Sequence, residues 1–192
     1  DDGVYMLTVQ NKSIENLTLT GTFYEAKDFA DILWGDAAYN AGDFGVAIQG
    51  GQIDSDAAGV KTTDAFGAKV STEMSGINLM AAYSKVKDGE ISNLVGETSA
   101  LYTNTVFDQL NEGAFTDEEK IVVGANMDAL GGNIAAAYAD SKNDDDADYT
   151  EFDLAYSTKL TDALGLTAAY VYVDQDNVDS ADVVRVIANY NF

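Results

Sequence analysis

The amino-acid sequence predicts an all-β protein, an antiparallel transmembrane β-barrel to which this chain contributes about eleven strands. Three observations predict this fold. Apolar and polar residues alternate along most of the chain. The segments with this alternation are joined by short turns and by longer polar loops in succession. One face of each segment is almost wholly aliphatic or aromatic. No stretch reaches the roughly 18 to 20 continuous apolar residues of a transmembrane helix, so we expect strands to cross any membrane.

A two-residue period defines the strands, because successive side chains of a strand point to opposite faces of its sheet. The period is clearest at the C-terminus, where one face carries Val184, Val186, Ala188, Tyr190 and Phe192 and the other carries Arg185, Asn189 and Asn191. Two more alternating segments run from Glu151 to Leu160 and from Leu166 to Tyr172. The remaining strands are expected near Val4–Gln10, Leu17–Glu25, Asp31–Asn40, Phe44–Gln52, Ala65–Met74, Ile77–Val86, Ile121–Met127 and Asn133–Ser141.

The connections fall into two alternating kinds. Short turns are expected at Asn11–Asn16, Ala41–Asp43, Ser75–Gly76, Asp128–Gly131 and Thr161–Leu164. Longer connections rich in Asp, Asn and Ser are expected at Asp54–Thr63, Lys87–Glu119, Lys142–Asp148 and Gln175–Ala181. Ala26–Phe29 is the exception, because it is a short connection at the end where the long loops are expected. This segregation is typical of strands that zigzag across a bilayer with short periplasmic turns and longer outer loops. A soluble β-sandwich is the alternative that alternation alone leaves open.

The polar face of the predicted sheet indicates a wet interior, since a dry core would not hold so many charges. The side chains that we expect to line a pore are Asp36, Lys69, Glu73, Lys120, Glu151, Asp153, Lys159 and Arg185. Basic and acidic groups are balanced in this set, which would create a transverse field across the channel. Trp34 falls on the same face as Asp36, although a one-residue slip in register would turn it towards lipid.

Composition excludes several classes of function. The chain has 10 basic and 33 acidic residues and a formal net charge of −23, which argues against nucleic acid as a partner and favours cations. It has no Cys and no His, so thiolate nucleophiles, imidazole bases and the usual zinc sites are missing, and we expect neither an enzyme nor a cofactor. Calcium at the acidic loop Asp144–Asp146 is a possibility, but the spacing is not that of an EF-hand, and a solvated loop is the alternative.

Several segments carry a resemblance to known proteins. The closing run VVRVIANYNF, with Phe192 last and Tyr190 two residues before it, resembles the C-terminal assembly signal of bacterial outer-membrane proteins. The segments FYEAKDFADILWGDAAYN and ISNLVGETSALYTNTVFDQLNEG, together with the final strands, resemble the major outer-membrane porin family of the Campylobacter group. The resemblance covers nearly the whole chain.

This resemblance implies a homotrimeric porin in the bacterial outer membrane, embedded in its lipid, whose mature chain forms a larger barrel. Residues 1–192 would then be the C-terminal part of one barrel domain. The strand count points the same way, because single-chain bacterial barrels have an even number of strands and periplasmic termini. Eleven strands ending in the periplasm therefore predict an incomplete barrel that lacks its N-terminal strands.

The expected function is passive diffusion of ions and small hydrophilic solutes through a water-filled channel. Acidic loops predict a mild preference for cations. An acidic surface-exposed β-protein with a structural or adhesin role is the alternative. The long connection Lys87–Glu119 carries apolar residues of its own, so it would either fold into the barrel mouth or cover the trimer or the outer rim.

Overall fold

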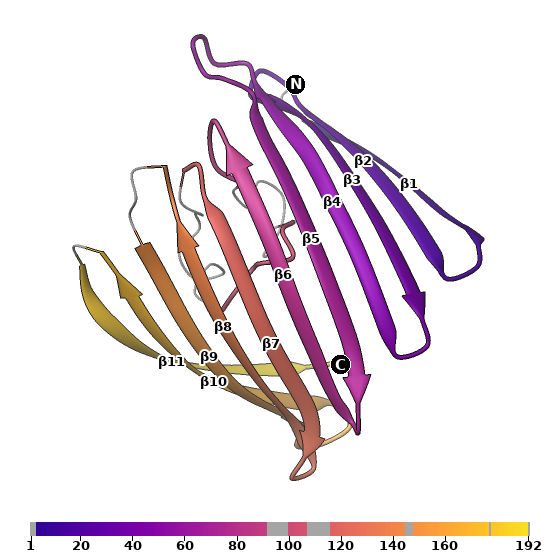
Figure 1. Cartoon of the computed structure of the whole chain (residues 1–192), viewed down its shortest axis with the longest axis vertical. Helices are drawn as coiled ribbons and strands as arrows, with labels where there is room; N and C mark the ends of the chain where they lie inside the picture. The colour runs from indigo at the N-terminus through magenta and orange to yellow at the C-terminus, as the bar shows by residue number, and fades with distance from the viewer. Residues whose placement is uncertain (1–2, 92–99, 107–115, 145–147, 177, 192) are drawn as a thin grey trace.

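The structure is a computed structural model that describes residues 3–91, 100–106, 116–144, 148–176 and 178–191. Eleven antiparallel strands form one sheet in which each strand pairs with its neighbours in sequence (Figure 1). The strands are β1 (Val4–Ile14), β2 (Leu17–Ala26), β3 (Ala30–Ala41), β4 (Phe44–Ser55), β5 (Thr63–Met74), β6 (Ile77–Lys87), β7 (Glu119–Ala129), β8 (Gly132–Lys142), β9 (Asp148–Lys159), β10 (Leu164–Gln175) and β11 (Val178–Tyr190). Within the described ranges, no helix is long and apolar enough to cross a membrane.

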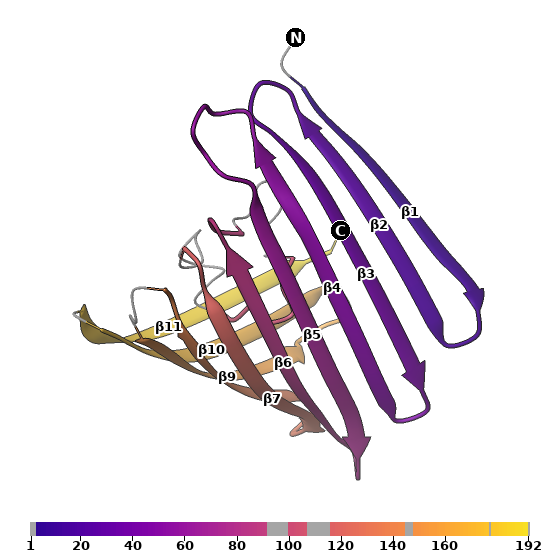
Figure 2. The ribbon, with the colours of Figure 1, turned by 45° about the horizontal axis from the view of Figure 1, so that its top comes forward.

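The sheet is strongly curved, and residues 100–106 lie on its concave side (Figures 1 and 2). β1 and β11 form its two edges, and the strand order places no described strand between them. The curvature follows from the twist that accumulates over many adjacent strands. The result is a trough with an inner and an outer face.

Tight turns join the strands at one end of the sheet. Residues 15–16, 42–43, 75–76, 130–131 and 160–163 form these connections. Ser75 and Gly76 have φ values of 55° and 78°, and Leu130 and Gly131 have 54° and 77°. Two successive positive φ values are the signature of a type I′ turn, whose twist matches that of the flanking strands.

The predicted strands are confirmed, with two corrections to their connections. The turn predicted at Asn11–Asn16 is shorter, because β1 continues to Ile14 through an irregularity in its pairing with β2. The loop predicted at Gln175–Ala181 is largely strand, since β11 begins at Val178. Both errors occur where pairing continues past a bulge, a feature that polar residues in the sequence disguise as a loop. The long connections, at the opposite end of the sheet from the tight turns, are therefore 56–62, 88–118 and 143–147.

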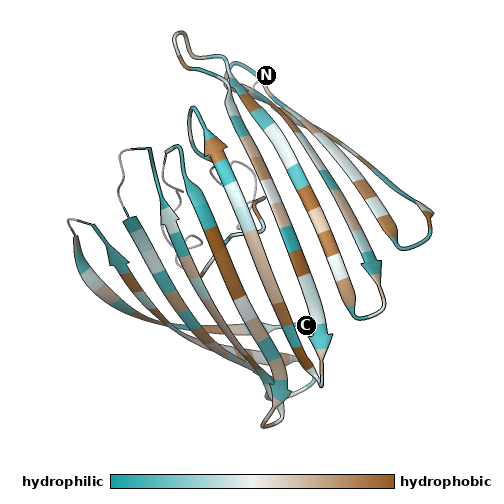
Figure 3. Cartoon of the chain, in the orientation of Figure 1, coloured by the Kyte–Doolittle hydropathy of each residue, from teal (hydrophilic) through white to brown (hydrophobic). Residues whose placement is uncertain are grey.

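The outer face of the sheet carries a band of exposed apolar side chains. Leu33, Ile48 and Ile121 are each more than half exposed although they lie within strands of the sheet. Brown and teal residues accordingly alternate along the ribbons in Figure 3. On β6, β8 and β10 an aromatic residue of this face is followed two residues later by a charged one, in the pairs Tyr83 and Lys85, Tyr138 and Asp140, and Tyr172 and Asp174. Aromatic residues at the border of an apolar band are typical of the membrane interface.

A matched pair of substitutions on β8 tests which face meets lipid. Ala136 pairs with Ala125 and Leu154 on the outer face, whereas its neighbour Ala135 pairs with Asn126 and Ala155 on the inner face. We expect Ala136→Arg to lower the free energy of unfolding by about 2–4 kcal/mol, because a charge at mid-bilayer depth costs about that much. Ala135→Arg should cost far less.

Chemical unfolding of both variants in lipid vesicles measures the difference. Equal losses for the two substitutions would show that the outer face does not lie in lipid.

Candidate functional site

All eight residues predicted to line a pore lie on the inner face of the sheet. Residues paired across antiparallel strands point to the same face, so pairing can be followed from strand to strand. One row joins Asp36, Gln49, Gly67, Ser84 and Lys120. A second joins Lys69 to Glu151 through Ala82, Val122 and Ala139, and a third joins Glu73 to Arg185 through Asn78, Asn126, Ala135, Ala155 and Ala169. Asp153 and Lys159 follow Glu151 at even spacing on β9.

The eight residues differ sharply in exposure. Lys120 and Glu151 are each 1% exposed and Asp153 is 6% exposed. The other five, Asp36, Lys69, Glu73, Lys159 and Arg185, are partly or fully exposed. The three buried residues are the ones that hydrogen-bond to residues 101–106.

Residues 101–106 cross the inner face from one side of the trough to the other. Leu101 packs in an apolar cluster with Ala65, Val86 and Ile91, at β5 and β6. Val106 packs against a second cluster of Tyr149, Val171 and Val173, at β9 and β10. The long connection therefore folds inward over its described part, which decides between the two placements that the sequence left open.

Polar contacts fix the middle of this segment. The hydroxyls of Thr103 and Ser84 lie 2.6 Å apart, and both residues are buried. The Thr105 hydroxyl donates to Glu151 Oε2 at 2.5 Å and accepts from Lys120 Nζ at 3.3 Å. The backbone N–H of Val106 donates to Asp153 Oδ2 at 3.1 Å.

Two of the buried charged residues, Lys120 and Glu151, also contact Tyr149 on the inner face. The Tyr149 hydroxyl donates a short hydrogen bond to Glu151, and Lys120 Nζ lies 5.3 Å from the centre of the Tyr149 ring. Lys69, on the open part of the wall, places its Nζ 4.5 Å from the ring of Tyr102, within the range of a cation–π contact. The segment is thus tied to charged side chains of β5, β7 and β9.

Trp34 lies on the inner face, as the predicted register has it. It pairs with Thr22 and Gly51 and packs against the apolar cluster that includes Leu101. A Cβ at Gly51 would lie 2.5 Å from Cε3 of Trp34 and closer still to the carbonyl oxygen of Leu33. Glycine at position 51 therefore makes room for the indole ring.

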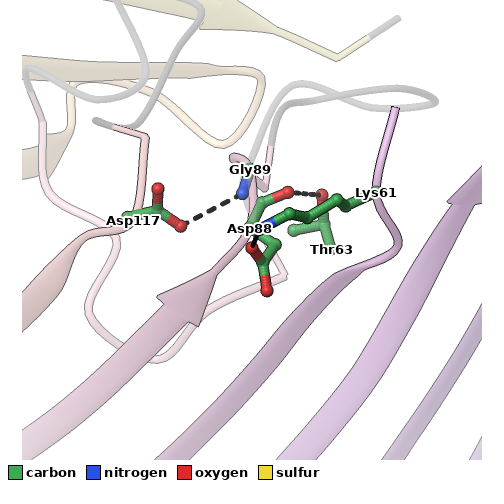
Figure 4. A network of polar contacts seen from close by, with 5 residues as sticks. All are labelled: Lys61, Thr63, Asp88, Gly89 and Asp117. Atoms are coloured by element: carbon green, nitrogen blue, oxygen red, sulfur yellow. Dashed lines mark hydrogen bonds and ion pairs between the residues drawn. The ribbon is translucent and has the colours of Figure 1, made fainter. Parts of the chain in front are cut away.

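A second polar network closes the base of the long connection at the mouth (Figure 4). The backbone N–H of Asp117 donates to the carbonyl of Gly89 at 2.9 Å, and Gly89 N donates to the Asp117 side chain at 3.3 Å. Lys61, from the connection between β4 and β5, forms an ion pair with Asp88. The Thr63 hydroxyl donates to the Asp88 carbonyl at 3.2 Å. These contacts join two neighbouring loops.

Some predicted residues fall outside the described part of the chain. These are Asp145 and Asp146 of the possible calcium loop, and Phe192 of the assembly signal. Tyr190 is described, lies on the outer face and is 64% exposed. Among the described residues, no group of three acidic side chains is arranged to hold a metal ion.

The residues that anchor the crossing segment were not among the predicted site residues. Ser84, Thr103, Thr105 and Tyr149 are neutral, and their types recur throughout the chain. In the run LYTNTV at 101–106 the structure buries Leu101, Thr103 and Thr105 and leaves the residues between them half-buried. Two of the three buried residues are polar, so the hydrophobicity of the run gives no signal of this arrangement.

Comparisons with known proteins were made by sequence and by structure. No protein-family model matches the chain, and no curated protein matches it in sequence. Several solved structures do match. Pseudomonas aeruginosa OccK8 (OprE) aligns with 97% of the chain and 57% of its own length, at 17% identity and a TM-score of 0.77. For Acinetobacter baumannii OccAB2 the shares are 98% and 54%, at 16% identity and a TM-score of 0.79.

A third match, Pseudomonas aeruginosa OprD, aligns with 97% of the chain and 60% of its own length, at 12% identity and a TM-score of 0.75. These proteins are outer-membrane porins with β-barrel folds. Identities this low establish the fold alone, and the predicted class, an antiparallel sheet of the outer-membrane β-barrel type, is confirmed. The chain spans little more than half the length of each of these structures.

The ion pair at the mouth predicts a pH dependence. The hydrogen bond from Lys61 lowers the pKa of the Asp88 carboxyl, and the same contact raises the pKa of the Lys61 ammonium group. A lowered carboxyl pKa stabilises the folded state above the ordinary value of about 3.9 and stops doing so as the pH falls through the lowered value. The raised ammonium pKa stabilises the folded state at pH values below the ordinary pKa of about 10.4, and this stabilisation is lost as the pH rises past the raised pKa.

Lys61→Met should therefore return the Asp88 pKa towards its ordinary value, which an NMR titration of the carboxyl in detergent micelles would measure. Lys12→Met, at the opposite end of the sheet, is the control. An unchanged Asp88 titration in Lys61→Met would show that the pair does not form in solution.

The contact at Gly51 predicts a change that the single tryptophan can report. Gly51→Ala should displace Trp34 and lower the free energy of unfolding by about 1–3 kcal/mol, the usual cost of overpacking. Trp34 fluorescence during denaturant unfolding measures both effects. Gly21→Ala is the matched control, because a Cβ there meets nothing within 4 Å. Identical spectra and stabilities for both variants would contradict the packing of Trp34 over Gly51.

Proposed function

We propose that the chain forms part of the wall of a bacterial outer-membrane porin that lets ions and small hydrophilic solutes diffuse through a water-filled channel. The observation that carries this proposal is the opposite character of the two faces of one sheet. The outer face exposes an apolar band bordered by aromatic and charged residues, whereas the inner face carries all eight of the charged residues named above. An acidic adhesin surrounded by water would have no reason to expose such a band.

The fold supports the same function. A sheet in lipid needs every backbone N–H and C=O group paired, which favours closure into a barrel. The chain's eleven strands correspond to little more than half of the matched porin structures, so it would supply about that share of the wall. Further strands would pair with the edges at β1 and β11.

The crossing segment gives the channel its narrow region. Residues 101–106 project from the inner wall into the trough, and they leave Asp36, Lys69, Glu73, Lys159 and Arg185 partly exposed on either side. Three of these five are basic, so the preference for cations has to come from the loops. Asp56, Asp88, Asp117, Asp144 and Asp176 all lie in connections at the same end of the sheet. Acidic groups at a channel entrance concentrate cations and repel anions.

The assignment to the Campylobacter-group porin family rests on the sequence segments described above, and it carries the proposals of a homotrimer and of an assembly signal at Tyr190 and Phe192. Chemical cross-linking in native membranes tests the trimer. Bands at three times the mass of the mature chain are expected, and a monomer alone would remove this proposal while leaving the channel intact.

Single-channel recording in a planar bilayer tests the proposed function. Protein extracted with detergent from its native source should insert in discrete conductance steps. Under a salt gradient its reversal potential should have the sign of a cation-selective pore, and the preference should weaken at high salt because the loop charges are screened.

An anion-selective reversal potential would contradict the role given to the acidic loops. Folded protein that never conducts would contradict the channel itself and favour a structural role.

A further inference from the structure

We propose that Lys120, Glu151 and Asp153 are positioning residues, which hold residues 101–106 across the inner wall so that solutes meet the segment and not these three charges. The proposal deepens the proposed function, and its meaning for permeation rests on that function. The contacts that carry it exist whether or not the protein conducts.

Burial is the first argument. Charged side chains are almost never fully buried unless they are paired, because removing an ion from water is costly. Lys120 and Glu151 are each 1% exposed, and among their contacts are hydrogen bonds with Thr105 of the segment and, for Glu151, with Tyr149. Wall charges meant to meet passing solutes would be exposed to water, as Lys69 and Glu73 are.

The path of the segment is the second argument. The N–H of Asn104 donates to the Leu101 carbonyl at 3.2 Å, so residues 101–104 form a turn. The segment nevertheless contacts the sheet at β5 and β6 and again at β9 and β10, on either side of β7 and β8. Apolar contacts hold both ends, at Leu101 and Val106, and hydrogen bonds to charged groups hold Thr105 in between.

The alternation within the segment is the third argument. Leu101, Thr103 and Thr105 are buried, and the two threonine hydroxyls contact wall residues, whereas Tyr102 and Asn104 are half-buried. The ring of Tyr102 contacts Lys69, one of the partly exposed wall charges. The wall charges left to meet solutes are then the five that are partly or fully exposed.

A thiol placed beneath the segment tests this directly. The chain has no cysteine, so Ser84→Cys introduces the only thiol, at a position that is 0% exposed. Its reaction with a water-soluble maleimide, in protein purified and reconstituted in lipid, should be slow. Adding Glu151→Gln should speed the reaction about tenfold or more, since weakening a hydrogen bond to a charged group shifts an equilibrium by at least that factor.

Controls separate this effect from a general loosening. Glu73→Gln removes an exposed carboxylate from the same face and should leave the labelling rate unchanged. If Glu151→Gln fails to fold, Thr105→Val removes the contact from the segment side and leaves every wall charge in place. Thr18→Val, an inner-face substitution on β2, is its matched control.

A disulfide provides the rescue. The Ser84 and Thr103 hydroxyls lie 2.6 Å apart, close enough for Ser84→Cys and Thr103→Cys together to bridge with little movement. In a Glu151→Gln background the oxidised double variant should restore the single-channel conductance of the wild type, and reduction should release it again. The unbridged Glu151→Gln channel should be wider and noisier.

The outcomes are distinct. Equal labelling of the Ser84→Cys thiol in all backgrounds would overturn the positioning role even if the wild type conducts. Faster labelling in Glu151→Gln or Thr105→Val alone, with a wild type that does not conduct, would uphold the positioning role and overturn the proposed channel.

Discussion

The constraint on which the structure depends is the hydrogen-bonded register between neighbouring strands. Each strand pairs without interruption over most of its length. Once it is known whether the odd- or the even-numbered residues of β2 face inward, the inward-facing residues of every strand to β11 are therefore fixed. One slip would exchange the faces of all strands beyond it. Because the register holds, aliphatic and aromatic side chains collect outside, and Lys69, Glu151 and Arg185 collect inside.

The inner face of the sheet is polar, and residues 101–106 pack across part of it. Lys120, Glu151 and Asp153 are buried on this face and hydrogen-bond to residues 101–106, unlike the other five charged residues of the predicted set. Desolvating these groups is costly, and hydrogen bonds from Thr105, Tyr149 and the Val106 backbone offset that cost. The same contacts tie these three wall residues to the segment. Lys69, which is partly exposed, contacts the segment through the ring of Tyr102.

Local patterns in the sequence predicted the sheet well, because a two-residue period is a local property that each strand displays alone. The strand segments, the face of Trp34 and the common face of the eight charged residues follow from it. The errors arose where the signal is not local. Polar residues near Asn11 and Val178 hid continued pairing, and the exposure of Lys120 or Glu151 depends on a segment that lies far from Glu151 in sequence. Hydroxyl anchors such as Thr103 carry no charge pattern that would reveal them.

The central claim is that one face of this sheet meets lipid and the other meets water. Nitroxide labels placed singly at the consecutive β10 positions Gly165, Leu166, Thr167 and Ala168, in the cysteine-free chain reconstituted in lipid, test it most directly. Accessibility to oxygen should peak at the even-numbered positions, and accessibility to a water-soluble nickel complex should peak at the odd-numbered ones. Nickel accessibility at every position, without a two-residue period, would contradict the claim.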